Sequence, residues 1–200
     1  MKTVTGLFDN YDDASDAVGQ LEASGVPHSD ISIVASNSTE WYDNGDSSKA
    51  AEDAAGGAGV GAVIGGAGGL LTGLGIMAIP GVGPVVAAGW LAATAVGALG
   101  GAAVGGAAGG IVGALTDSGV PEEDANVYAE GVRRGGTLVT AKVDEDLVAD
   151  AERILGQSKV NLDERRSKYQ ADGWTAFDAD AENYTPGEFG RDGARDVNRA

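Results

Sequence analysis

A long stretch without any charged residue, from Ala54 to Leu115, constrains this chain more than any other feature. Within it, glycine recurs at every fourth position in two series. The series are Gly57, Gly61, Gly65, Gly69 and Gly73, then Gly97, Gly101, Gly105, Gly109 and Gly113. Residues four apart lie on one face of a helix, where glycine lets two backbones approach closely. The spacing therefore predicts two long helices folded back on each other, each with a glycine stripe for helix packing.

Between the two series, Pro80, Gly81, Gly83 and Pro84 predict a sharp break in the chain. Each glycine costs a helix about 0.8–1 kcal/mol relative to alanine, so such helices are not stable alone in water. We therefore expect the hairpin to pack against itself, against other copies of the chain, or inside a bilayer. A flexible glycine–alanine linker is the alternative, but the regular spacing and the interleaved Val, Ile and Leu residues argue against it.

The segments on either side of this stretch have the residue patterns of an α+β domain. The expected elements are a strand at 2–8, a helix between Asn10 and Gly25, a strand at 31–35, a helix from Pro121, a strand at 137–143, a helix after Asp144 and a last strand at 159–163. Without the insertion and the helix from Pro121, the order is β-α-β then β-α-β, as in a ferredoxin-like fold. The predicted fold is thus α+β, a ferredoxin-like split βαβ sandwich interrupted by a long glycine-zipper helical hairpin.

Composition divides the chain into four segments. These are a first βαβ half with a polar linker at 1–48, the glycine-zipper hairpin at 49–117, a helix with the second βαβ half at 118–165, and an acidic tail with aromatic residues at 166–200. Because Asp, Glu, Gly, Ala and Arg dominate the tail, we predict that it is largely disordered. The alternative is that Trp174 and Phe177 dock on the folded domain.

The formal net charge of −17 comes entirely from the segments outside the uncharged stretch. Acidic segments disfavour nucleic acid and anionic lipid as partners, so we predict no nucleic-acid binding.

The chain has no cysteine, and His28 is its only histidine, which argues against disulfides, Cys or His metal clusters and a Ser-His-Asp triad. The glycine-rich runs lack the preceding strand and the following acid of a dinucleotide loop. We predict no catalytic residue, no cofactor, no metal site and no small-molecule substrate.

Two groups of residues resemble a known family. The first group is Thr5-Gly6-Leu7-Phe8, the helix that follows, Gly25-Val26-Pro27 and Ile31-Ser32-Ile33-Val34. It resembles the start of a general stress protein 17M-like domain, also called a heat-induced stress protein YflT-like domain. The second group is Gly119 to Ala125, Tyr128, Gly131-Val132 and Gly135 to Val139. It resembles the second half of longer bacterial members with a glycine-rich insert.

This resemblance covers residues 1–165. It implies an association with the stress response and a ferredoxin-like core. The family supplies no catalytic residues, so the resemblance assigns none to this chain. The acidic tail lies outside it.

Two functions fit these patterns. In the first, a non-enzymatic bacterial general stress-response protein associates with the inner membrane through residues 54–115, since each predicted helix exceeds the roughly 20 residues needed to span a bilayer. In the second, the glycine stripes pack hairpin on hairpin, which gives a soluble homo-oligomer or a partner-binding module. The N-terminus lacks a basic and then apolar signal segment, so we expect the flanking segments in the cytoplasm. Membrane fractionation with and without detergent separates the two functions.

Overall fold

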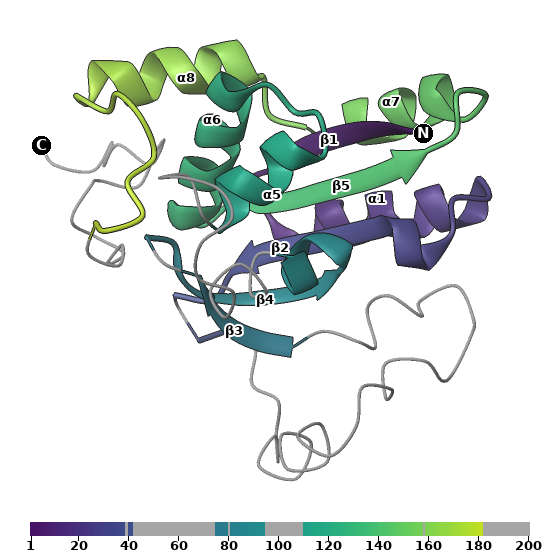
Figure 1. Cartoon of the computed structure of the whole chain (residues 1–200), viewed down its shortest axis with the longest axis horizontal. Helices are drawn as coiled ribbons and strands as arrows, with labels where there is room; N and C mark the ends of the chain where they lie inside the picture. The colour runs from purple at the N-terminus through teal and green to yellow at the C-terminus, as the bar shows by residue number, and fades with distance from the viewer. Residues whose placement is uncertain (39, 42–74, 80, 95–109, 158, 182–200) are drawn as a thin grey trace, which may run out of the picture.

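The computed structural model describes residues 1–38, 40–41, 75–79, 81–94, 110–157 and 159–181. They form an α+β domain with a five-stranded antiparallel sheet (Figure 1). The elements in chain order are β1 (Lys2–Phe8), α1 (Tyr11–Ala23), the 3-10 helix η1 (His28–Asp30), β2 (Ile31–Ser36), β3 (Gly75–Ile79), β4 (Gly83–Gly89), α5 (Ile111–Asp117), α6 (Glu122–Arg133), β5 (Thr137–Val143), α7 (Val148–Gly156) and α8 (Leu162–Ala171). Residues 90–94 continue from β4 as helix.

The strand order in the sheet is β1-β5-β2-β4-β3, and every neighbouring pair is antiparallel. β2 and β5 lie side by side, as expected for the second and third strands predicted from the flanks. All six residues of β2 are buried, and so is β5 apart from Lys142. A strand buried on both faces requires a packed layer on each side of the sheet.

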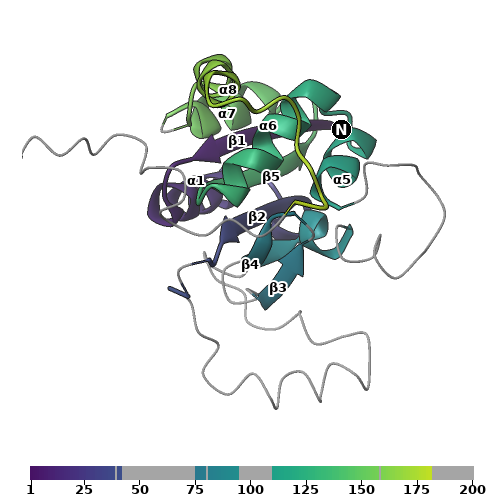
Figure 2. The same ribbon diagram turned by 90° about the vertical axis from the view of Figure 1, so that its left-hand side faces the viewer.

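Helices supply both of these layers (Figure 2). On one face, α1 and α7 place Val18, Leu21 and Leu155 against the sheet. On the other face, α5 and α6 place Leu115 and Val132 against it. The domain therefore has three layers, with a hydrophobic core on each side of the sheet.

The predicted helical hairpin is wrong over residues 75–89, where β3 and β4 form a β-hairpin. In its turn, the Val82 N–H donates to the Ile79 carbonyl at 3.0 Å. Gly81 takes a φ of 73° there, so the break predicted from prolines and glycines does occur. Isoleucine and valine favour the pleated, half-buried surface of a sheet, and this segment lies between the two glycine series.

Most of the predicted helix-packing glycines, Gly57 to Gly73 and Gly97 to Gly109, lie outside the described residues. Gly113 lies half-buried in α5. The insertion is also not independent of the α+β domain, because Ile79, Val85 and Leu115 belong to the hydrophobic core beside α6. Removing the whole of 54–115 would therefore remove part of that core.

The predicted last strand at 159–163 is also wrong, because α8 begins at Leu162. Asn161 caps this helix, and its Oδ1 accepts from the backbone N–H groups of Asp163 and Glu164, both at 3.1 Å. An Asn cap followed by acidic residues stabilises a helix start through hydrogen bonds and the helix dipole. One strand-like bond remains, in which the Val160 N–H donates to the Leu7 carbonyl of β1 at 2.7 Å.

The acidic tail is described as far as residue 181. Its first residues belong to α8, and Trp174 then packs edge-on against Tyr169, with ring centroids 5.8 Å apart. The Phe177 N–H donates to Oδ1 of Asn126 in α6 at 3.0 Å, and the Phe177 ring packs on the core beside α5 and α6. These contacts match the docking alternative for residues 174–177, whereas residues 182–200 lie outside the described residues.

Candidate binding cavity beside the first strand

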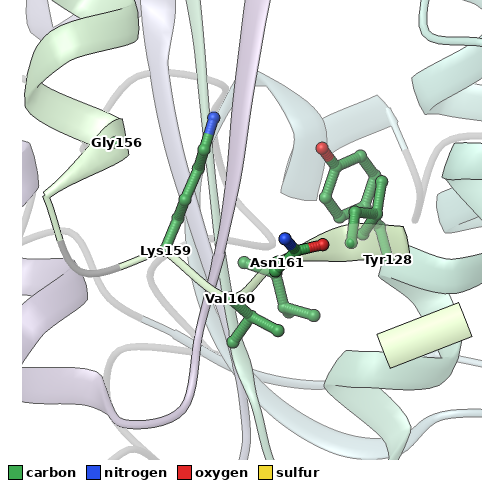
Figure 3. Close-up of a pocket in the computed structure, with 7 residues that line it drawn as sticks. Tyr128, Gly156, Lys159, Val160 and Asn161 are labelled. Carbon is green, nitrogen blue, oxygen red and sulfur yellow. The ribbon is translucent and has the colours of Figure 1, made fainter. Parts of the chain in front are cut away.

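A cavity of about 450 Å³ lies where the chain passes from α7 to α8 along the outer edge of β1 (Figure 3). Four elements, β1, α6, α7 and α8, contribute to it together with the link between α7 and α8. Its lining residues are Leu7 of β1, Tyr128 of α6, Gly156 at the end of α7, and Lys159, Val160, Asn161 and Leu162.

Two local interactions fix the link that lines the cavity. The Val160 backbone is held against β1 by its bond to the Leu7 carbonyl, and Asn161 is held by its capping bonds at the start of α8. In Figure 3, Lys159 extends alongside the β1 ribbon, and Asn161 lies between Lys159 and Tyr128. Three polar side chains therefore surround a space whose other walls are apolar.

Tyr128 is the most perturbed titratable group of the cavity. Burial raises its pKa to about 12, and the nearby Asp124 carboxylate acts in the same direction. Both effects disfavour the charged phenolate. The phenol is therefore protonated across the physiological range and available as a hydrogen-bond donor.

The polar side chains all present donors to the cavity. The Asn161 Oδ1 is already occupied by two backbone N–H groups, which leaves its amide NH₂, while Lys159 carries an exposed ammonium and Tyr128 a phenol. Leu7, Val160 and Leu162 supply apolar walls. The cavity suits a small ligand with acceptor oxygens and an apolar portion. Its seven lining residues include no carboxylate, imidazole or thiol, and its polar groups are the Tyr128 phenol, the Lys159 ammonium and the Asn161 amide.

A buried ion-pair network holds the wall formed by α6 and α8. The side chain of Glu130 is 2% exposed, and its carboxylate accepts from Nε of Arg133 at 3.0 Å and from Nε of Arg134 at 2.6 Å. The Arg134 guanidinium also stacks over the Tyr169 ring, 4.2 Å from its centroid, and donates to Asp172 at 3.1 Å. A buried carboxylate is tolerated only when it is paired, so this network fixes α8 on α6.

The sequence patterns did not point to this cavity. Gly113, the one predicted helix-packing glycine in the described part of the chain, lies in α5 and does not line it. Tyr128, Lys159 and Asn161 were missed as cavity residues. A signal for Asn161 was present, since an Asn followed by Asp163 and Glu164 is typical of a helix start.

Two further features concern the described residues alone. No helix in this part of the chain combines the length and the apolar character needed to cross a bilayer. No group of three or more His, Cys, Asp or Glu side chains in the same part is placed to hold a metal ion.

Comparison with known proteins finds a family match for the first part of the chain. The family model of the heat induced stress protein YflT domain matches residues 3–81. The match runs from β1 to the turn after β3, and it confirms the family resemblance over this segment. The second resembling group, within 119–139, lies outside the match. Neither a curated protein nor a solved structure matches the chain.

Proposed function

Because residues 3–81 carry a YflT stress-protein domain, we propose that this protein is a non-enzymatic bacterial general stress-response protein that acts by self-assembly. The family match is the observation that carries the stress role. The partner is a second copy of the chain, and neither nucleic acid nor a catalytic substrate is involved.

Self-assembly is supported by the uncharged stretch between Ala54 and Leu115 in a chain of net charge −17. All charged residues lie outside this stretch and sum to a negative charge, so two copies can approach along it at a low electrostatic cost. The glycines at Gly57 to Gly73 and Gly97 to Gly109 are proposed to contribute close packing there.

The finer fold assignment belongs to the same proposal. We infer that β1, α1, β2, β5 and α7 are the frame of a ferredoxin-like split βαβ sandwich. The Val160 bond to Leu7 supports this, since it lies on the edge of β1 that a fourth strand would occupy. In this interpretation α8 replaces most of that strand, and β3 and β4 extend the sheet at its other margin.

Membrane association through residues 54–115 is the alternative, and the absence of charge in that stretch is what favours it. The β-hairpin at 75–89 counts against it, because it leaves less chain for two spanning helices. Inner-membrane attachment with cytoplasmic flanks is therefore the second candidate.

One set of experiments tests the role and the mode of action. A strain lacking the gene should survive heat less well than its parent, and the full-length gene should restore survival; equal survival under heat, salt and acid stress would contradict the stress role. Purified full-length protein should form a defined oligomer by light scattering without detergent. A protein that stays in washed membrane pellets and needs detergent for release would favour the membrane alternative.

A further inference from the structure

The outer edge of β3 presents unpaired backbone groups. The Pro84 carbonyl accepts from the Asn37 N–H at 2.8 Å, so the backbone of Pro84 faces the β2 side of β4. Successive residues of a strand face opposite neighbours, so Val85 faces β3, where it is the register partner of Met77. The backbone of Met77 therefore points into the sheet. The N–H and C=O groups of Ile76 and Ala78 point away from it.

Within the described residues, β3 carries none of the usual protection of an edge strand. Natural edges carry charges, prolines, bulges or a covering element that prevents pairing with another chain. β3 reads Gly-Ile-Met-Ala-Ile, with no charge and no proline. Ile76 is 43% exposed and is one of the few exposed large hydrophobic residues among those described. β3 is thus a template for a further antiparallel strand.

We propose that β3 pairs antiparallel with β3 of a second copy of this chain, about a two-fold axis that passes through Met77. This rests on the proposed self-assembly and names its interface. In this register Ile76 lies opposite Ala78 of the second copy, and Ala78 lies opposite its Ile76. The four outward-facing N–H groups and four outward-facing C=O groups of the two strands then form four hydrogen bonds, and one sheet runs through both copies.

Charge and shape favour a second copy over a different protein. The chain is strongly acidic, yet two β3 strands meet without bringing any charged side chain of either strand together. The outward-facing groups are symmetric about Met77, so the edge is complementary to itself. The same axis sets the large Ile76 beside the small Ala78 on one face of the joined sheet, where the two side chains form a cross-strand contact.

The register can be tested by cross-linking, because the chain has no cysteine of its own. Met77 would face Met77 of the second copy as a pair without mutual backbone bonds, with Cα atoms roughly 4.5 Å apart, which a disulfide can bridge. We expect Met77→Cys to form a covalent dimer on mild oxidation, seen on a non-reducing gel. Ile76→Cys alone should cross-link poorly, since its two copies would lie roughly 8 Å apart. A mixture of Ile76→Cys and Ala78→Cys should cross-link well.

A second variant tests the hydrogen bonds. Ala78→Pro removes an outward N–H and no β3–β4 bond, so it should weaken association at least tenfold by light scattering and leave the circular dichroism of the fold unchanged. Ala78→Ser keeps the N–H and serves as the matched control. A monomeric parent protein would overturn both the self-assembly and this interface. An oligomer in which Met77→Cys does not cross-link would overturn the β3 pairing and leave self-assembly standing.

Discussion

The two edge strands of the sheet, β1 and β3, differ in how far other parts of the chain cover their outward-facing backbone groups. At β1, the outward-facing carbonyl of Leu7 already accepts a hydrogen bond from Val160, in the link between α7 and α8. Lys2 ties the start of the strand to Glu152 of α7 with an ion pair of 3.2 Å. β3 at the opposite margin has a short, uncharged sequence and an exposed Ile76.

This difference shows that protection of an edge depends on the segments that the fold places beside the strand. β1 is an ordinary amphipathic strand, and its edge is closed by residues more than a hundred positions further along the chain. The protected edge contains the cavity, and the unprotected edge contains the proposed interface. The two candidate sites of the protein thus lie at opposite margins of one sheet.

The largest effect is expected where β4 joins the sheet. A Cβ at Gly89 would collide with the Ile31 carbonyl and lie 2.7 Å from the Ser32 Cα, and Gly89 has a φ of 91°. Gly89→Ala should therefore lower the free energy of unfolding by more than about 4 kcal/mol, or separate β3 and β4 from the sheet. Urea unfolding measures this. Gly75→Ala in β3, with no atom within 4 Å of the added methyl, is the control, and an equal loss in both variants would contradict the prediction.

The next effect concerns the network that supports the β1 side. Glu130→Ala removes the carboxylate that both Arg133 and Arg134 contact, and should cost about 3 kcal/mol. Detachment of α8 should also shift the fluorescence of Trp174 to longer wavelength, measured with Trp41 and Trp90 replaced by Phe. Glu123→Ala, at an exposed position of α6, should cost at most about 1 kcal/mol. Unchanged stability of Glu130→Ala would show that α8 is held in another way.

A smaller effect is expected from the hydrogen bond between the Val160 N–H and the Leu7 carbonyl at the outer edge of β1. Val160→Pro removes the N–H that bonds to Leu7, whereas Val160→Ala keeps it. The proline variant should be less stable than the alanine variant by about 1 kcal/mol, the usual net contribution of one hydrogen bond. Chemical denaturation of the two variants gives this difference. If the two variants unfold at the same denaturant concentration, the Val160 bond does not stabilise the β1 edge.

The last effect is confined to high pH and leaves stability at neutral pH unchanged. Burial raises the pKa of both Tyr128 and Tyr169 to about 12, from an ordinary value of 10.0. Above pH 10 the unfolded chain releases phenol protons that the folded state keeps, so the free energy of unfolding should fall as pH rises from about 10 to about 12. Tyr128→Phe should reduce this slope. Phenolate absorbance checks the cause, since a folded protein whose tyrosines all ionise near pH 10 would contradict it.

The parts of the fold that could be predicted from sequence are those with local periodicity. β1, α1, β2, α6 and β5 follow the expected spacing of apolar residues and start and stop signals. β3 and β4 could not be predicted in this way, because the pairing of β4 with β2 is a tertiary interaction that local periodicity does not report. Before α8, the alternation of the apolar residues Val160 and Leu162 is typical of a strand. The capping bonds of Asn161 instead start a helix at Leu162.

The cavity could not be predicted because it depends on distances between elements. Leu7 and Lys159 are at opposite ends of the folded sequence, and only the three-layer packing brings them together.

The pairing of β2 with β5 has a consequence for the kinetics of folding. These central strands are joined by residues 37–136, so their contact closes a loop of about half the chain. The entropy of closure grows only as the logarithm of loop length, and doubling the loop costs roughly 0.6 kcal/mol. The folding rate depends more strongly on this topology, because contacts between residues far apart in the sequence slow the search for the native structure. We expect the two ends of the chain to meet late, after α1 with β2 and the β3–β4 hairpin have formed from nearby residues.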